Sequence, residues 1–71
     1  MPGEIPFFIE GRIVEILPNS EMALVKVLNG NIYHLFPYTP GIIFDSLRLE
    51  QTVRLEVTSA LARVLSANIL A

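Results

Sequence analysis

The chain of 71 residues contains no cysteine, one histidine and only five Lys and Arg residues against seven Asp and Glu. No disulfide can form, and a structural zinc site is excluded because such a site usually needs four Cys or His ligands. The formal net charge of −2 and the pI of about 5.1 argue against strong, independent binding of DNA or RNA, which is typical of basic domains. We expect neither a metal nor a cofactor.

The chain also has no basic leader at its start and no apolar run near the roughly 18 residues of a transmembrane helix. These absences predict a cytoplasmic protein without a membrane partner. Hydrophobic residues make up 52% and charged residues 17%, which predicts a folded chain rather than a disordered one. Residues 1–71 are long enough for one domain, with roughly 3–5 kcal/mol of stability from a single small core.

The N-terminal part of the sequence predicts one long, bent strand. Residues 1–6 include two prolines, which remove backbone donors, so they are expected to form an extended lead-in. Residues 8–17 are rich in β-branched side chains, but the apolar alternation changes phase after Ile13. Such a slip predicts a β-bulge, and Gly11 supports a bend or a close backbone approach within the strand.

Two predicted turns separate the next strands. Residues 18–21 are dense in turn-forming types, and residues 22–28 alternate with Ala23, Val25 and Val27 on one side and Lys26 on the other, which predicts a second strand. The dipeptide Asn29-Gly30 favours a type I′ turn, which predicts a hairpin leading into a third strand over residues 31–36. Pro37 would end that strand because it lacks a backbone donor.

The C-terminal half is partly ambiguous. Residues 52–57 alternate cleanly and predict a fourth strand with one solvated face. Residues 42–49 fit a single helical turn or an approach to a strand. Residues 59–65 fit a helix capped by Ser59, whereas residues 63–70 also fit a closing strand, and periodicity alone slightly favours the helix. Five short strands in one small domain predict an all-β closed barrel, because closure removes exposed strand edges.

Four stretches carry a family resemblance: residues 9–19 with their Leu-Pro-Asn turn, residues 25–30 with their Asn-Gly hairpin, residues 47–49, and residues 52–57. Over residues 9–57 the chain resembles bacterial translation initiation factor one, a single oligonucleotide/oligosaccharide-binding (OB) barrel of five strands. The resemblance implies that the C-terminal tail is the fifth strand. It also implies a non-enzymatic module that binds RNA or the small ribosomal subunit.

The chain departs from that family in the segment that follows the third strand. The family carries a cluster of Lys and Arg there, which helps it dock on ribosomal RNA, whereas residues 39–47 contain no Lys or Arg and one Asp. Each lost phosphate contact reduces the counterion release that drives binding. Any binding to RNA or to the small subunit is therefore expected to be weak.

Three cations are candidate phosphate contacts, because Arg12, Lys26 and Arg54 fall at outward positions of their predicted strands. The alternative is that nearby Glu10, Glu15 and Glu56 neutralise them in cross-strand ion pairs.

Tyr33 and Tyr38, on or just after the third strand, are candidate rings for base stacking. The alternative is that they shield the barrel rim while Phe36 fills its interior. His34 has no Cys nucleophile and no carboxylate at motif spacing to join, so catalysis is not expected.

A second hypothesis of a different class is protein contact or self-association. Leu28 and the loop residues Ile42, Ile43 and Phe44 would form an apolar contact patch for another protein or a second copy if they were exposed together. The alternative is that the three loop residues plug the bottom of the barrel. A monomer is favoured at ordinary concentrations.

Overall fold

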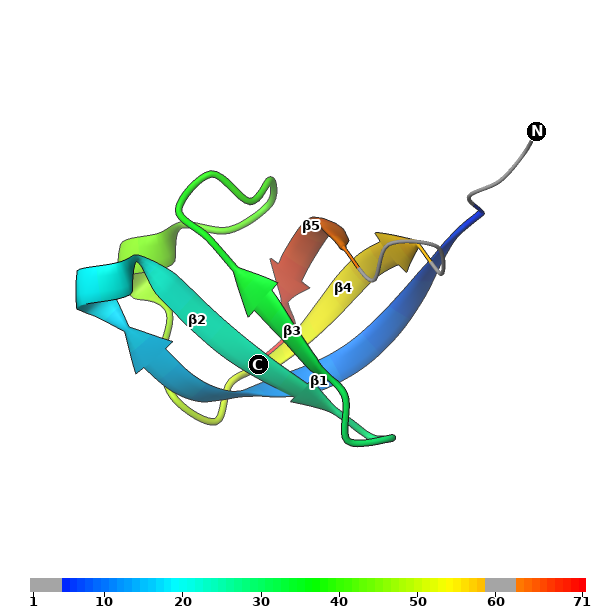
Figure 1. Cartoon of the computed structure of the whole chain (residues 1–71), viewed down its shortest axis with the longest axis horizontal. Coiled ribbons are helices and arrows are strands. Elements are labelled where there is room, and N and C mark those ends of the chain that lie inside the picture. The colour runs from blue at the N-terminus through cyan, green and yellow to red at the C-terminus, as the bar shows by residue number, and fades with distance from the viewer. Residues whose placement is uncertain (1–4, 59–62) are drawn as a thin grey trace.

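The computed structural model describes residues 5–58 and 63–71 and has an all-β fold (Figure 1). Its strands are β1 (Pro6–Leu17), β2 (Met22–Val27), β3 (Ile32–Leu35), β4 (Thr52–Thr58) and β5 (Val64–Ile69). The helical elements of the described residues are two 3₁₀ turns, η1 (Pro18–Ser20) and η2 (Phe44–Ser46). The predicted fold class is confirmed, and of the two alternatives for residues 42–49 the structure has the helical turn, η2.

The strands form one antiparallel sheet in the order β3-β2-β1-β4-β5. β1 is long enough to serve both halves of the sheet, since residues 6–12 pair with β4 and residues 11–17 pair with β2. The sheet curls so that its two ends, β3 and β5, approach each other with some Cα atoms within 8 Å (Figure 1). No ladder joins these two strands in the described residues, so the fold is an OB-like half-barrel.

The predicted bulge and close approach in β1 are confirmed. The register against β2 shifts between Ile13 and Glu15, which leaves Val14 as the extra residue. A Cβ on Gly11 would lie 2.6 Å from Cγ1 of Val25 and 2.8 Å from the carbonyl oxygen of Lys26. β1 can therefore lie this close to β2 only because residue 11 has no side chain.

The β2–β3 hairpin forms where it was predicted, but its turn is not type I′. Gly30 has a positive φ of 93°, whereas Asn29 does not. The Gly30 N–H donates to the carbonyl of Val27 at 2.9 Å, and the Val27 N–H donates to the carbonyl of Asn31 at 3.1 Å. This is a three-residue loop in which the glycine alone adopts the left-handed region. Oδ1 of Asn29 accepts the Asn31 N–H at 2.9 Å, which favours this loop over the shorter turn.

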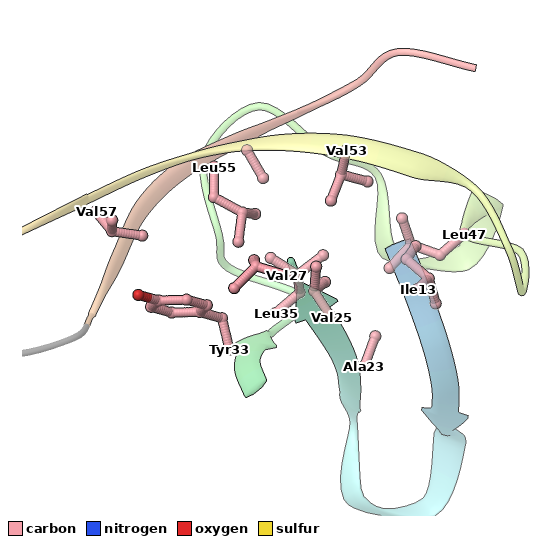
Figure 2. Close-up of a cluster of buried hydrophobic side chains, with 11 residues drawn as sticks. Ile13, Ala23, Val25, Val27, Tyr33, Leu35, Leu47, Val53, Leu55 and Val57 are labelled. Atoms are coloured by element: carbon pink, nitrogen blue, oxygen red, sulfur yellow. The ribbon is translucent and has the colours of Figure 1, made fainter. Parts of the chain in front are cut away.

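The inward faces of the strands, with one residue from the β3–β4 connection, build a single core (Figure 2). Its buried members are Ile13, Ala23, Val25, Val27, Tyr33, Leu35, Leu47, Val53, Leu55, Val57 and Ala67. Ile42 and Phe44 pack against this core from the β3–β4 connection. The plug alternative therefore holds for two of its three residues, because Ile43 is exposed.

The C-terminal tail is a strand over residues 64–69, so the helical alternative is wrong for these residues. Pairing with β4 decides the conformation, since Leu55 lies opposite Ala67 and Val53 lies opposite Ile69. Burial of Ala67 against the core outweighs a weak local preference for helix. The predicted cap at Ser59 lies outside the described residues.

The β3–β4 connection closes part of the seam between β3 and β5. The Ala67 N–H of β5 donates to the carbonyl of Pro40 at 2.9 Å, so the connection occupies an edge position that β3 would fill in a closed barrel. Gly41 has a φ of 96°, and a Cβ there would collide with the carbonyl oxygen of Ala67. The connection can lie this close to β5 because residue 41 has no side chain.

Candidate nucleic-acid interface

A groove of about 760 Å³ lies between β3 with the turn that follows it and the start of β5. It is lined by Ile32, Tyr33, His34, Phe36, Tyr38, Thr39, Pro40, Arg63, Val64 and Leu65. Most of this lining is aliphatic or aromatic. Arg63 is the only charged residue among the described residues that line it. The groove therefore combines aromatic surface with a positive charge.

A row of rings runs along this wall at every second residue. The rings of Phe36 and Tyr38 are stacked with their centroids 5.2 Å apart and their planes 4° apart. His34 meets Phe36 edge to face, with centroids 6.2 Å apart and planes at 90°. These two ring contacts put residues 34, 36 and 38 side by side, although residues 37 and 38 lie in the turn that follows β3.

The turn after β3 fixes the outermost ring of this row. Oγ1 of Thr39 accepts the Phe36 N–H at 2.9 Å, and the Thr39 N–H donates to the carbonyl of Phe36 at 3.0 Å. Thr39 itself is buried, so the turn is anchored rather than solvated. Tyr38 remains 78% exposed, which leaves one face of its ring open to a further planar group.

Tyr33 does not offer a comparable ring. It faces inward opposite Val25 and is 8% exposed, and its ring belongs to the core cluster (Figure 2). The hypothesis that Tyr33 is an exposed stacking ring is therefore wrong. The reason is register, because one step along β3 exchanges the core face for the solvent face. Tyr38 is exposed and remains a candidate stacking ring.

The three predicted phosphate contacts form an outward strip over β1, β2 and β4. Arg12 lies directly opposite Lys26 in the β1–β2 register, and both are exposed. Nη1 of Arg12 lies 3.4 Å from Oε1 of Glu50, which sequence reasoning did not identify as its partner. Such exposed pairs contribute only about 0–1 kcal/mol to stability, yet each carboxylate cancels a nearby positive charge.

Arg54 is also paired, since its Nη2 lies 3.9 Å from Oε2 of Glu10, one of the three carboxylates considered as partners for the strip. Glu56 instead accepts a hydrogen bond from Oγ of Ser66 at 3.0 Å. Within the described ranges 5–58 and 63–71, no ion pair involves Lys26. The strip is therefore largely compensated, and Lys26 is its remaining uncompensated cation.

The four residues predicted to form an apolar contact patch are not brought together. Leu28 is fully exposed at the tip of the β2–β3 hairpin, and Ile43 is exposed near η2. Figure 1 shows this hairpin and η2 at opposite ends of the molecule. Ile42 and Phe44 are half-buried against the core. The interpretation of these residues as one patch is therefore wrong.

Sequence reasoning missed two contributors to the groove. Phe36 was interpreted mainly as barrel filler, although the spacing of aromatic residues at 34, 36 and 38 was a usable signal. Arg63 was not singled out because it lies in the tail, whose conformation was ambiguous. Only the position of β5 opposite β3 brings Arg63 to the rings.

Comparison with known protein families, curated proteins and solved structures found no match to this chain. The resemblance to initiation factor one is not tested by these comparisons and stays a prediction. In the described part of the chain, no three His, Asp or Glu side chains gather as a metal site would require. None of its helical segments has the length and apolar character needed to cross a membrane.

Proposed function

We propose that the protein is a non-enzymatic, initiation-factor-like OB module that binds single-stranded RNA weakly through the groove between β3 and β5. One observation carries this proposal: Tyr38 is stacked on Phe36, with its other face exposed, at a groove whose charged residue is Arg63. Stacking of a base on an aromatic ring contributes about 1–3 kcal/mol, and every base has a face that can stack. A cation in the same groove can contact the phosphate backbone of the bound strand.

The strip supplies a second cation beside this groove. Lys26 lies opposite Ile32 in the β2–β3 register, and Ile32 is a lining residue. A strand of RNA that follows β3 from Tyr38 to Ile32 would therefore reach Lys26, which lies on the neighbouring strand β2. Strands 2 and 3 and the loops beside them are the usual ligand surface of OB folds, which supports the assignment by analogy.

Single-stranded RNA fits this surface better than a duplex does. A ring as exposed as Tyr38 stacks on an unpaired base, whereas the bases of a duplex are already stacked on one another. The net charge of −2 and the compensated strip keep the attraction to phosphates small. The family resemblance suggests RNA of the small ribosomal subunit as the source of such a ligand.

The test is a titration of a labelled single-stranded RNA of about 12 nucleotides, within the site sizes of OB folds, at low and moderate salt. We expect Tyr38→Ala to weaken binding by about 5–150-fold, the equivalent of about 1–3 kcal/mol of stacking. Arg63→Ala should weaken binding and flatten the salt dependence by about 0.7 in logarithmic slope, as one lost contact to a single strand predicts.

Two matched controls separate the groove from general surface effects. Ile43→Ala removes an exposed apolar side chain, and Arg48→Ala removes an exposed cation, and neither residue lines the groove. Both variants should bind RNA as the unmodified protein does. Absence of binding to single-stranded RNA and to small ribosomal subunits at low salt would overturn the proposal, as would unchanged binding by Tyr38→Ala.

A further inference from the structure

Among the described residues, the first half of β1 is paired along one edge only. The Ile13 N–H donates to the carbonyl of Gln51 at 3.0 Å, and the Glu50 N–H donates to the carbonyl of Ile13 at 2.8 Å, so the backbone groups of Ile13 face the β4 side. Backbone groups of successive residues in a strand point to opposite edges. Counting back from Ile13, those of Phe8 and Glu10 therefore face away from β4.

No described strand occupies that opposite side. β2 pairs with β1 only from Gly11 onward, because the β2–β3 hairpin turns away after Val27. Residues 6–10 are therefore paired on one side, by β4, and unpaired on the other within the described chain. An edge strand with unpaired N–H and C=O groups is a template for another strand.

The same short segment carries neighbouring exposed apolar side chains. Ile5 is 77% exposed, Phe7 41% and Phe8 64%. Figure 1 shows this end of β1 projecting beside β4, away from the β2–β3 hairpin. Side chains alternate along a strand, so Phe7 and Phe8 present exposed apolar surface on opposite faces of this edge.

We propose that two copies of this chain associate weakly by antiparallel pairing of residues 6–10 about a twofold axis at Phe8. In this register the Phe8 N–H of each copy donates to the Phe8 carbonyl of the other. The Glu10 N–H of each copy donates to the Pro6 carbonyl of the other. Pro6 has no N–H, so the reciprocal bond to Glu10 is missing, and the pairing is limited to a few hydrogen bonds.

The second copy is the occupant that matches the chemistry of this edge. Antiparallel pairing of the segment with itself places Phe8 opposite Phe8 on one face and Phe7 opposite Ile9 on the other. Apolar side chains therefore meet apolar side chains on both faces of the new pair of strands. Glu10 lies opposite Pro6 in this register, so no two like charges are brought face to face.

The available area predicts a weak dimer. The exposed fractions of Ile5, Phe7 and Phe8 correspond to roughly 300–400 Å² in each copy, since a large apolar side chain presents roughly 150–250 Å². Two copies would bury roughly 600–800 Å² of side-chain surface, below the roughly 1,200 Å² at which stable interfaces begin. None of these three residues lines the RNA groove, so this inference does not rest on the proposed function.

Sedimentation of the full chain over a wide concentration range tests the proposal. We expect reversible dimers at high concentration, and Phe8→Lys should weaken them at least about tenfold because it sets two like charges directly opposite each other. The matched control is Leu28→Lys, which makes the same kind of change at a fully exposed hairpin residue and should leave dimerisation unchanged. A strict monomer at about 1 mM, or equal losses in both variants, would overturn the proposal.

A crosslinking variant tests the register itself, because the chain contains no cysteine. Residues that exchange hydrogen bonds across an antiparallel pair have Cα atoms about 5.5 Å apart, which lies within the disulfide range of about 4.4–6.8 Å. Phe8→Cys should therefore form a disulfide-linked dimer under mild oxidation faster than Leu28→Cys does. Equal rates for the two variants would show that Phe8 does not lie on a twofold axis.

Discussion

The groove between β3 and β5 and the outward strip over β1, β2 and β4 both carry cations, but their surroundings differ. In the strip, antiparallel pairing sets Glu10 opposite Arg54, and Glu50 lies beside Arg12. In the groove, Arg63 is accompanied by rings and aliphatic side chains, with no carboxylate among the described lining residues. Counting cations along a sequence therefore does not locate a phosphate-binding surface, because strand register decides which of them are compensated.

Each of the two surfaces depends on a glycine that lets backbones approach. Gly41 allows the wall of the groove to lie against β5, and Gly11 allows β1 to lie close against β2 in the part of the sheet that carries the strip. Gly30, at the tip of the hairpin, has open space around it and needs only its positive φ. Substitutions at these three positions therefore distinguish glycines that are needed to avoid a steric clash from one that is needed for its positive φ.

The largest expected effect is on folding. Gly41→Ala combines a positive φ of 96° with a collision against the Ala67 carbonyl, so we expect it to remove at least about 2 kcal/mol of stability. In a domain of this size that loss lowers the melting temperature by about 8–16 °C. Gly11→Ala should have a similar effect through Val25 and Lys26. Thermal denaturation followed by circular dichroism measures both.

Gly30→Ala is the matched control for these two variants. Its φ of 93° is unfavourable for alanine, but no atom lies within 4 Å of the added Cβ. We expect a loss of about 1 kcal/mol, or about 4–8 °C in melting temperature. If Gly41→Ala melted no lower than Gly30→Ala, the close contact between the connection and β5 would be wrong, and with it the wall of the groove.

The next effect compares stacking in the groove with charge in the strip. Tyr38→Ala should reduce affinity for single-stranded RNA by about 5–150-fold, whereas Lys26→Ala should reduce it by less and mainly at low salt. A stacking contact survives added salt, while a phosphate contact does not. Titrations at two salt concentrations distinguish the two losses, and a larger loss for Lys26→Ala would move the site to the strip.

A smaller effect is expected among the arginines. Arg63→Ala should flatten the logarithmic salt slope by about 0.7, as loss of one contact to a single strand does. Arg54→Ala removes the same charge, but Glu10 already compensates it in the free protein. We therefore expect little change in slope for Arg54→Ala. Equal changes for the two variants would mean that the ion pair opens when RNA binds.

The smallest effect on RNA affinity should come from removing the carboxylate that compensates Arg12. Glu50→Gln removes the carboxylate beside Arg12 and should raise RNA affinity by about two- to threefold at low salt, with a stability change below about 1 kcal/mol. Glu21→Gln, at the left-handed residue after η1, removes an exposed carboxylate outside the strip and serves as the control. The same gain in RNA affinity for both variants would indicate that net charge, and not the Arg12–Glu50 pair, determines the gain.

Much of the fold was accessible from short-range signals. The phase slip around Val14 predicted the bulge, Pro37 predicted the end of β3, and the alternation of residues 52–57 predicted β4. The turn type at Asn29-Gly30 was not accessible, because a side-chain hydrogen bond to Asn31 favours the longer loop. Local propensity also left the tail undecided, since pairing with β4 determines β5.

The candidate site was less predictable than the fold. Of the rings that the sequence offered for stacking, Tyr38 is exposed in the groove, whereas the ring of Tyr33 faces the core. Sequence reasoning grouped Leu28 with the loop of residues 42–44, which lies at the other end of the molecule. It treated residues 1–6 as a lead-in and so missed the exposed apolar end of β1. The error over Leu28 concerned which segments meet, whereas the errors over Tyr33 and residues 1–6 concerned the face and the start of a single strand.

The sequence by itself determined the secondary structure that depends on neighbours along the chain: alternation sets a strand's faces, and proline and glycine set its ends and bends. Only the tertiary structure decided which residues from other strands and loops lie against those faces. Arg63 joins the rings of Phe36 and Tyr38 because the curl of the sheet brings β5 opposite β3, and Arg12 and Arg54 are compensated because the register brings Glu50 and Glu10 beside them. Charge and stacking act over a few ångströms in space, and separation along the chain does not fix that distance.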